Sequence, residues 1–169
     1  KEIALECYIR DAATGKKLLG KKYRGKVAYV RSMAHRFANQ LVRALTGERG
    51  IFESKILFVR DHGTSKDLYV MDYDGHGMKR LTSTNTVNVF PAFADSNTLV
   101  WTSFLRGKPD LYKGSVSTGE SSIFIYSRSV ETSPAVSMIE GRVAYASSTP
   151  GNLEIFTAAL DKTGVRQLT

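Results

Sequence analysis

The sequence predicts a mainly β fold, in which part of a small α/β domain precedes about three four-stranded blades of a β-propeller. The main observation is a unit of about 43 residues that repeats from residue 56 to residue 169. Each unit carries two aromatic residues eleven positions apart: Phe58 and Tyr69, Trp101 and Tyr112, and Tyr145 and Phe156. Prolines recur at the same spacing, at Pro91 and Pro134. A repeat of this length, built from short strands, is typical of propeller blades.

The middle unit shows how one blade is expected to be built. Its apolar runs predict four strands, at residues 91–93, 99–103, 110–113 and 123–126. Gly, Asn and Asp lie between these runs, where hairpin turns need positive φ angles and hydrogen bonds from side chains to the backbone. Pro91 suits the first residue of a strand, where its missing N–H group does no harm. One such sheet cannot bury both of its faces alone, so the blades are expected to stack.

Two strands are expected ahead of the repeats. Apolar and polar residues alternate over 2–10, a turn follows at 11–15, and a return strand is expected over 18–24. With the helix that follows, these strands predict one part of a small α/β layer. We therefore place an incomplete α/β domain with a short connector at 1–53 and the blades at 54–169.

The helix is predicted by apolar residues that recur three and four positions apart: Ala34, Phe37, Ala38, Leu41, Val42 and Leu45. Ser32 is the expected N-cap, because its hydroxyl can accept a hydrogen bond from a free N–H group of the first turn. Gly47 marks the expected end of the helix.

The positive charge lies almost entirely in the N-terminal part. The net charge is +8, and residues 1–55 hold 13 Lys and Arg against five Asp and Glu, whereas residues 56–169 hold 11 of each. A basic domain can serve nucleic acid, an acidic membrane or an acidic protein. The lysines crowd at residues 16–22 without interleaved aromatic residues, which favours a solvated hairpin face over a nucleic-acid site. No apolar run approaches the roughly 20 residues of a membrane span, so membrane insertion is not expected either.

The start of the chain predicts that it is part of a longer protein. Residues 1–5 already have the alternation of a strand interior. No proline-alanine-aromatic run precedes residue 56, so the first blade is expected to begin at its second strand. Such a blade would leave one strand edge unpaired, which normally promotes association.

No residue pattern predicts catalysis, a metal or a cofactor. The sequence lacks a G-x-S-x-G elbow, an H-E-x-x-H pair and a glycine loop for phosphate. Cys7 is the only cysteine, which excludes a cysteine zinc cluster, and it is expected to be a buried thiol of the first strand. The three histidines lie in different predicted elements: His35, His62 and His76. His35 has no partner nearby in the sequence and is expected at the surface or at an edge.

Residues 72–77 resemble the start of a calcium loop, with acidic residues at the first and third positions and glycine at the sixth. Ser83 replaces the glutamate that such a loop needs at its twelfth position. A tight hairpin turn is therefore favoured over a calcium site. A binding protein is expected rather than an enzyme.

The helix and its junction with the first blade have a distinctive sequence. Residues 34–38 (AHRFA), 45–52 (LTGERGIF) and 56–59 (ILFV) precede DLYVMDYDG at 67–75, which closes on RLT at 80–82. Together these segments resemble the TolB family, the periplasmic propellers of the Tol–Pal cell-envelope system. The resemblance implies a periplasmic protein that binds a Pal-like peptidoglycan-associated lipoprotein. It also implies contact with a TolA-like protein through a segment ahead of residue 1.

The resemblance further implies a partner-binding site just ahead of each proline, where loops converge at the mouth of the propeller channel. Five residues form this predicted site: Asn88, Phe90, Glu131, Thr132 and Ser133. Asn88 supplies donors and acceptors, Phe90 offers an apolar anchor, and Glu131 can pair with a basic group.

Two alternatives stay open at this point. Similar repeats occur in the gate propeller of prolyl-oligopeptidase-like hydrolases, which a serine hydrolase domain elsewhere in the protein would favour. The repeated aromatic residues could instead stack on sugars in a TolB-like propeller that senses a ligand or glycan. Their regular recurrence favours packing between blades.

Overall fold

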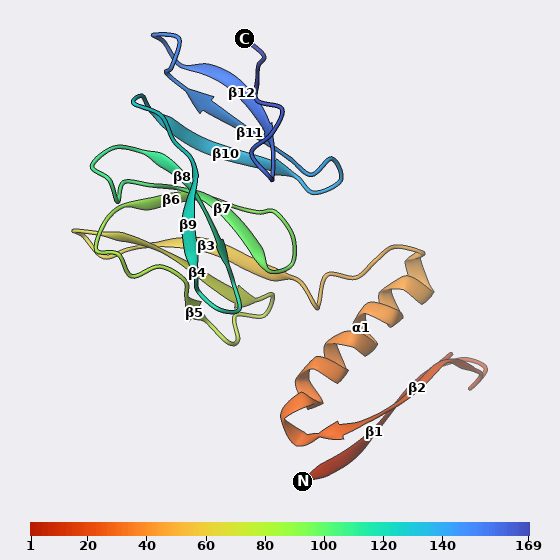
Figure 1. Ribbon diagram of the computed structural model, residues 1–169. Coiled ribbons are helices and arrows are strands. Elements are labelled where there is room, and N and C mark those ends of the chain that lie inside the picture. Colours follow the sequence, from red (N-terminus) through yellow and green to blue (C-terminus); the bar gives the residue numbers. More distant parts are fainter. The chain divides into compact units, whose positions relative to one another are not determined.

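A computed structural model describes all residues from Lys1 to Thr169 (Figure 1). The chain forms two compact units. Unit 1 holds Lys1–Lys55 and Asp72–His76, and unit 2 holds Ile56–Met71 and Gly77–Thr169. The second segment of unit 1 begins at the last residue of strand β4 (Lys66–Asp72) and forms the turn that follows it.

Unit 1 contains a hairpin and a helix, α1 (Val30–Thr46), which lies beside it (Figure 1). Strand β1 (Glu2–Arg10) pairs antiparallel with β2 (Lys17–Lys26), and Leu5 lies opposite Tyr23. Alternate residues of β1 are exposed and half-buried along its whole length, as the sequence predicts. Cys7 is one of the half-buried residues, so the prediction of a buried thiol is wrong.

The helix begins earlier than the sequence predicts. A 3₁₀ turn, η1 (Val27–Tyr29), leads directly into α1, and Tyr29 occupies the N-cap position without a capping side chain. The prediction of Ser32 as N-cap is wrong, because its hydroxyl donates to the Tyr29 carbonyl at 2.9 Å inside the first turn. Gly47 ends the helix with φ 79°, as predicted. None of the helices combines the length and the apolar character that a membrane crossing requires.

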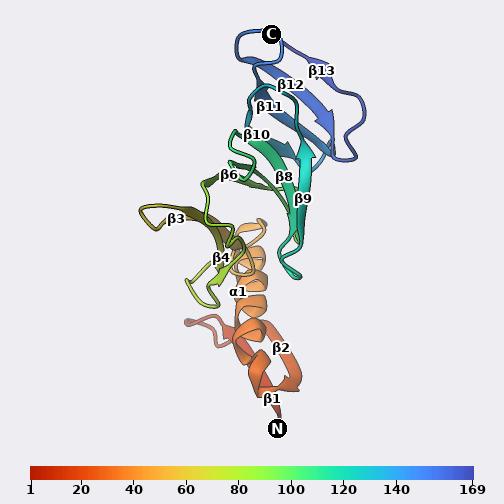
Figure 2. The ribbon, with the colours of Figure 1, turned by 60° about the vertical axis from the view of Figure 1, so that its left-hand side comes forward.

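Unit 2 contains three antiparallel sheets, each with its strands in sequence order (Figures 1 and 2). The first sheet has three strands: β3 (Lys55–Asp61), β4 and β5 (Lys79–Arg80). The second has four: β6 (Asn88–Phe93), β7 (Thr98–Ser103), β8 (Asp110–Ser115) and β9 (Ser121–Ile125). The third has four: β10 (Glu131–Ser137), β11 (Arg142–Ser147), β12 (Glu154–Ala159) and β13 (Arg166–Gln167). Strand β3 lies at the edge of the first sheet without an inner partner, as predicted.

The repeated aromatic residues pair across the second and third strands of each blade. The ring centroids lie 5.7 Å apart for Phe58 and Tyr69, 6.0 Å apart for Trp101 and Tyr112, and 5.9 Å apart for Tyr145 and Phe156. Cross-strand aromatic pairs of this kind stabilise a sheet beyond the area that they bury. The second and third pairs also belong to or pack against the buried clusters between blades, which confirms the predicted packing for these two pairs.

Buried side chains join neighbouring blades. The cluster between the first and second blades contains Leu68, Val70, Leu99, Trp101 and Tyr112. The cluster between the second and third contains Val100, Leu111, Phe124, Val143 and Tyr145. Tyr69 lies between Leu68 and Val70 in sequence and therefore faces away from the second blade. Tyr69 and Tyr112 thus occupy the same side of their blades.

The inner strands start earlier than the sequence predicts. Strand β6 begins at Asn88 and β10 at Glu131, rather than at the prolines. The pairing register shifts around Pro91 and around Pro134, which marks a β-bulge in both strands. A proline in a bulge interrupts no regular ladder bond, so the strand continues through it. Placing the five predicted site residues in loops ahead of the strands is therefore wrong.

Candidate functional site

The five predicted site residues lie at equivalent positions of two inner strands, β6 and β10, which are neighbours in unit 2. Each strand holds one residue of its bulge in the left-handed region, Phe90 at φ 52° and Ser133 at φ 55°. A residue other than glycine is rarely found there, at a cost of about 1–3 kcal/mol. The surrounding sheet has to hold both residues in place.

Asn88 anchors the start of β6. Its side chain is only 1% exposed. The amide group donates to the Lys66 carbonyl at 3.2 Å and to Thr84 Oγ1 at 3.1 Å, and Oδ1 accepts from Trp101 Nε1 at 3.2 Å. Every polar atom of this side chain is therefore engaged inside the protein, which assigns Asn88 a supporting role.

Glu131 anchors the equivalent position of β10 and is also only 1% exposed. Its carboxylate accepts from Ser127 Oγ at 2.5 Å, from Ser127 N at 3.1 Å and from Ser147 Oγ at 3.3 Å. Lys108 Nζ lies 3.7 Å away and supplies the nearest positive charge. Burial raises the pKa of Tyr145, and the Glu131 carboxylate raises it further.

The other three predicted residues remain accessible. Phe90 is 55% exposed although it lies within a strand, Ser133 is exposed, and Thr132 is half-buried. The Ser133 N–H donates to Thr102 Oγ1 of the preceding blade at 3.0 Å, which fixes the second bulge. Phe90 is thus the one large apolar group that the bulges present to solvent.

A group of exposed side chains at the same end of the second blade was not predicted. The start of β6 pairs with the end of β7, so the loop after Ser103 lies at that end. We call its exposed residues the rim: Phe104, Leu105, Arg106 and Tyr126. Arg106 lies over the Tyr126 ring at 5.1 Å, and the Phe104 N–H donates to the Val87 carbonyl at 3.0 Å. The rim is apolar and cationic.

The repeat itself carried a signal for these residues. Phe90, Phe104 and Tyr126 are aromatic residues without an aromatic counterpart in the neighbouring blades. The aromatic residues of the second and third repeated pairs pack between blades, whereas these three are exposed. These three residues therefore remain available for contacts, whereas Phe124, which also lacks an aromatic counterpart, is buried between blades.

An acidic residue lies near the start of the third strand in every blade: Asp67, Asp110 and Glu154. In the first blade Thr82 completes its hydrogen bonds. Thr82 Oγ1 donates to Asp67 Oδ1 at 3.0 Å and accepts from the Leu68 N–H at 3.0 Å. Both Asp67 and Thr82 are buried, so neither bond can be replaced by water at the surface.

The same arrangement recurs in the third blade but not in the second. Thr169 Oγ1 donates to Glu154 at 2.7 Å. In the second blade Ile125 occupies the equivalent position, and Asp110 Oδ2 is buried without a hydrogen-bond partner. The second blade therefore lacks a hydroxyl that the other two possess.

Thr82→Val is expected to lower the free energy of unfolding of unit 2 by about 1–3 kcal/mol, because two buried groups lose their partner. Conversely, Ile125→Thr should be more stable than Ile125→Val by about 1 kcal/mol. Thr and Val are of equal size, but the Thr hydroxyl gives Asp110 a hydrogen-bond donor. Urea titrations followed by circular dichroism measure both differences. Thr86→Val, at a hydroxyl without a side-chain hydrogen bond, is the control. Equal stability of the two Ile125 variants would contradict this assignment.

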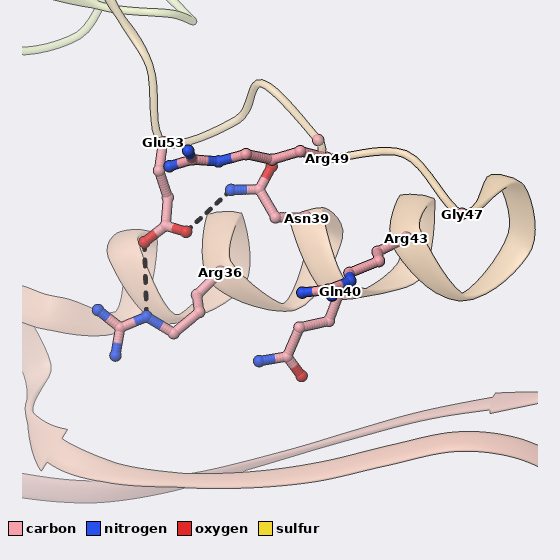
Figure 3. A pocket seen from close by; sticks show the side chains of 8 residues that line it. Arg36, Asn39, Gln40, Arg43, Gly47, Arg49 and Glu53 are labelled. Atoms are coloured by element: carbon pink, nitrogen blue, oxygen red, sulfur yellow. Dashed lines mark hydrogen bonds and ion pairs between the residues drawn. The ribbon is translucent and has the colours of Figure 1, made fainter. Parts of the chain in front are cut away.

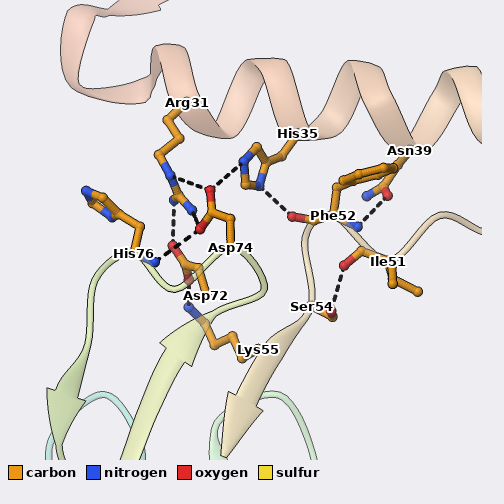
Figure 4. Close-up of polar contacts among 10 residues, drawn as sticks. All are labelled: Arg31, His35, Asn39, Ile51, Phe52, Ser54, Lys55, Asp72, Asp74 and His76. Atoms are coloured by element: carbon orange, nitrogen blue, oxygen red, sulfur yellow. Dashed lines mark hydrogen bonds and ion pairs between the residues drawn. The ribbon is translucent and has the colours of Figure 1, made fainter.

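A second polar cluster lies within unit 1, where α1 meets the turn at Asp72–His76 (Figure 4). Arg31 binds Asp72 at 2.6 Å and also binds Asp74. His35 lies between two acceptors, the Phe52 carbonyl at 2.5 Å from Nδ1 and Asp74 Oδ2 at 3.1 Å from Nε2. His35 is half-buried rather than at the surface, and its partner Asp74 is distant in the sequence.

The turn is a tight hairpin, as favoured by the sequence. Gly75 adopts φ 84°, and its N–H donates to the Asp72 carbonyl at 2.8 Å. The two carboxylates that resembled calcium ligands bind Arg31, His35 and Lys55. No group of three or more His, Cys, Asp or Glu side chains in the chain is arranged to hold a metal ion.

Unit 1 is expected to lose stability in acid through Asp72. Hydrogen bonds from Lys55 at 2.7 Å and from Arg31 hold the pKa of Asp72 below its ordinary value of 3.8. Because the folded pKa is depressed, this contribution is present above about pH 4 and is lost as the pH falls through the folded pKa. The Tyr73 N–H donates to the Ser54 carbonyl at 3.0 Å, and its rate of hydrogen exchange measures this loss of stability.

Between pH 5 and about 3 the exchange of this N–H should accelerate beyond the intrinsic pH effect. Asp72→Asn should exchange faster at pH 5 and show a smaller dependence on pH. Glu48→Gln, at an exposed carboxylate without an ion pair, should retain the dependence of the unmodified protein. If Asp72→Asn retains it as well, another group is responsible.

Comparisons with known proteins agree with this architecture. A sequence model of the family described as "TolB beta propeller domain" matches residues 42–169. The chain is 32% identical over 166 residues to the "Tol-Pal system protein TolB" of Desulfosudis oleivorans and 31% identical over 166 residues to a "Protein TolB homolog" of Chlorobaculum tepidum. Each match covers 98% of this chain and 38% of the relative, so the chain spans about two fifths of their length.

A solved structure shows the same fold. The crystal structure of TolB from Acinetobacter baumannii superposes with a TM-score of 0.81 at 21% identity, over 99% of this chain and 46% of that one. The repeat, the stacked blades and the sequence matches lead to one conclusion: the chain belongs to the TolB β-propeller family.

Proposed function

We propose that this chain is a non-enzymatic, periplasmic protein-binding module of a Tol–Pal system, and that its partner is a Pal-like peptidoglycan-associated lipoprotein. The name of one relative supports the system, since a "Tol-Pal system protein TolB" matches 98% of this chain. The exposed aromatic residue Phe90, held in the left-handed region within the bulge of β6, supports the place of contact.

Phe90 has the properties of a binding anchor. An exposed phenyl ring buries a large apolar area when a partner covers it, and such residues dominate interface energies. Its backbone is held by the sheet, so little conformational freedom remains to be lost on binding. Strain of this kind is retained where the surrounding structure imposes it, and it is frequent at functional sites.

The remaining predicted residues take different roles in this proposal. Thr132 and Ser133 offer hydroxyl groups at the second bulge, beside the first. Asn88 and Glu131 are buried and position the two strands without touching the partner. The rim adds an apolar and cationic border at the end where β6 begins, which suits a partner surface with apolar and acidic groups.

The test is a calorimetric titration of the full-length protein with the soluble domain of the peptidoglycan-associated lipoprotein from the same organism. Phe90→Ala is expected to weaken binding by about thirtyfold, which corresponds to a hot spot of about 2 kcal/mol. Ile139→Ala is the matched control, because Ile139 is 95% exposed in the turn between β10 and β11, away from the start of β10. It should change the affinity by less than about twofold.

If the affinity of Phe90→Ala stays within twofold of that of the unmodified protein, the binding site does not lie at the bulges. No binding by the unmodified protein would reject the partner itself. Circular dichroism of each variant verifies that the fold is retained.

A further inference from the structure

A groove of about 640 Å³ lies along α1 in unit 1, between the helix and the connector that follows it (Figure 3). Arg36, Asn39, Gln40 and Arg43 of the helix line one side, and Arg49 and Glu53 of the connector line the other. All of these residues belong to unit 1. The predicted partner site lies in unit 2, so the groove is a separate feature.

The connector is held firmly against the helix. Asn39 Oδ1 accepts from the Phe52 N–H at 2.9 Å, and Asn39 Nδ2 donates to Glu53 Oε2 at 2.8 Å. Gly50 approaches so closely that a Cβ atom there would lie 2.8 Å from Asn39 Cα. Only glycine fits at this distance, because the obstacle is backbone rather than a flexible side-chain end. The groove is therefore a formed feature of unit 1.

The charge of the groove is unbalanced. Three guanidinium groups face it, and Glu53 is its only carboxylate. Arg36 Nε lies 3.4 Å from Glu53 Oε1, which pairs one of the three. Arg43 and Arg49 have no carboxylate within the 4.0 Å of an ion pair. Two arginines thus lack an acidic partner in the chain, although Arg is the side chain best suited to bind carboxylates through two parallel hydrogen bonds.

The spacing of the arginines indicates an extended ligand. Arg36 and Arg43 lie two turns apart on one face of α1, a separation of about 10 Å along the axis. A polyproline II segment has three residues per turn and rises about 3.1 Å per residue, so carboxylates three positions apart lie on one face and span about 9 Å. We propose that this groove binds an acidic segment of a partner polypeptide through Arg36, Arg43 and Arg49.

The proposal also predicts a role for Glu53. Its carboxylate occupies the position that a ligand carboxylate would take beside Arg36, and it therefore competes with the ligand. Glu53→Gln retains an acceptor for Asn39 and removes the competing charge. This variant should bind the ligand more tightly, a direction opposite to that of the arginine variants.

The test is a titration of the ¹⁵N-labelled chain with a short capped peptide of glycine and serine that carries glutamates three positions apart. Amide shift changes are expected to gather at residues 36–53. Arg43→Gln combined with Arg49→Gln should weaken binding by about tenfold, from two exposed ion pairs of up to about 1 kcal/mol each. Lys21→Gln combined with Arg24→Gln removes the same charge from two exposed residues of β2 and should change the affinity by less than about twofold.

Four results would overturn the proposal. They are shift changes spread over the lysines of the hairpin, an equal loss in the control pair, equal binding of the peptide with glutamine in place of glutamate, and full displacement by inorganic phosphate at the peptide's own concentration. Tighter binding by Glu53→Gln, with the peptide located at residues 36–53, would support it. Circular dichroism of each variant excludes unfolding as the cause of a loss.

Discussion

Trp101→Ala is expected to lower the free energy of unfolding of unit 2 by about 3–5 kcal/mol, the usual cost of truncating a large buried aromatic residue. Trp101 is only 4% exposed and belongs to the cluster between the first two blades. Its ring packs over Gly114, where a Cβ atom would lie 2.9 Å from the indole. Its truncation removes the cross-strand pair with Tyr112, the contacts to Leu68 and Val70, and the hydrogen bond to Asn88.

Urea unfolding followed by far-ultraviolet circular dichroism measures this loss, since the variant has no tryptophan to report by fluorescence. Trp101→Phe is the matched variant, because it keeps most of the packing and loses the Nε1 hydrogen bond to Asn88. It should cost less than half as much as Trp101→Ala. A loss below about 1 kcal/mol for Trp101→Ala would mean that the blades do not depend on this cluster.

Glu131→Ala is expected to lower the free energy of unfolding of unit 2 by about 2–3 kcal/mol, because hydrogen bonds to a buried charged group are lost together. Ser127 and Ser147 would lose their acceptor, and Lys108 would keep only Asp110 as an ion-pair partner. The same urea titration measures the change. Thr132→Ala, at the next residue, is the control and should stay within about 1 kcal/mol.

The same variant also tests whether Glu131 only positions β10 or itself contacts the partner. If Glu131 only positions β10, the fraction of Glu131→Ala that stays folded should bind the partner with nearly unchanged affinity. A folded, stable Glu131→Ala that has lost binding would instead make Glu131 a contact residue. That outcome would contradict the supporting role assigned from its burial.

The blades could be predicted from the sequence because their signal is repeated. Phe58 and Tyr69 alone would be an unremarkable pair, but three such pairs at one spacing identify equivalent strands and the faces that meet between blades. The helix could also be predicted, since its apolar residues recur at helical spacing and Gly47 marks its end. Repetition and periodicity are local properties of a sequence, and they need no knowledge of tertiary contacts.

The features that could not be predicted depend on contacts between distant residues. The proline after Phe90 suggested the start of a strand, whereas a bulge with a left-handed residue carries the strand through it. The partner of His35 is Asp74, which is distant in the sequence and lies beside His35 only in the folded structure. Asn88 and Glu131 have polar side chains that suit a loop, but neighbouring strands bury and satisfy them. Polarity alone does not distinguish an anchor from a contact residue.

Hydrogen exchange of the full-length protein, with and without the soluble domain of the peptidoglycan-associated lipoprotein, tests the central claim most directly. The bulges lie near the start of β6 and β10, and the turns after β6 and β10 lie at the other end of the same strands. The proposed contact predicts slower exchange in peptides that cover residues 82–92 and 125–134, with no change at 93–98 and 137–142. Protection confined to those turns, with the bulges unchanged, would contradict it.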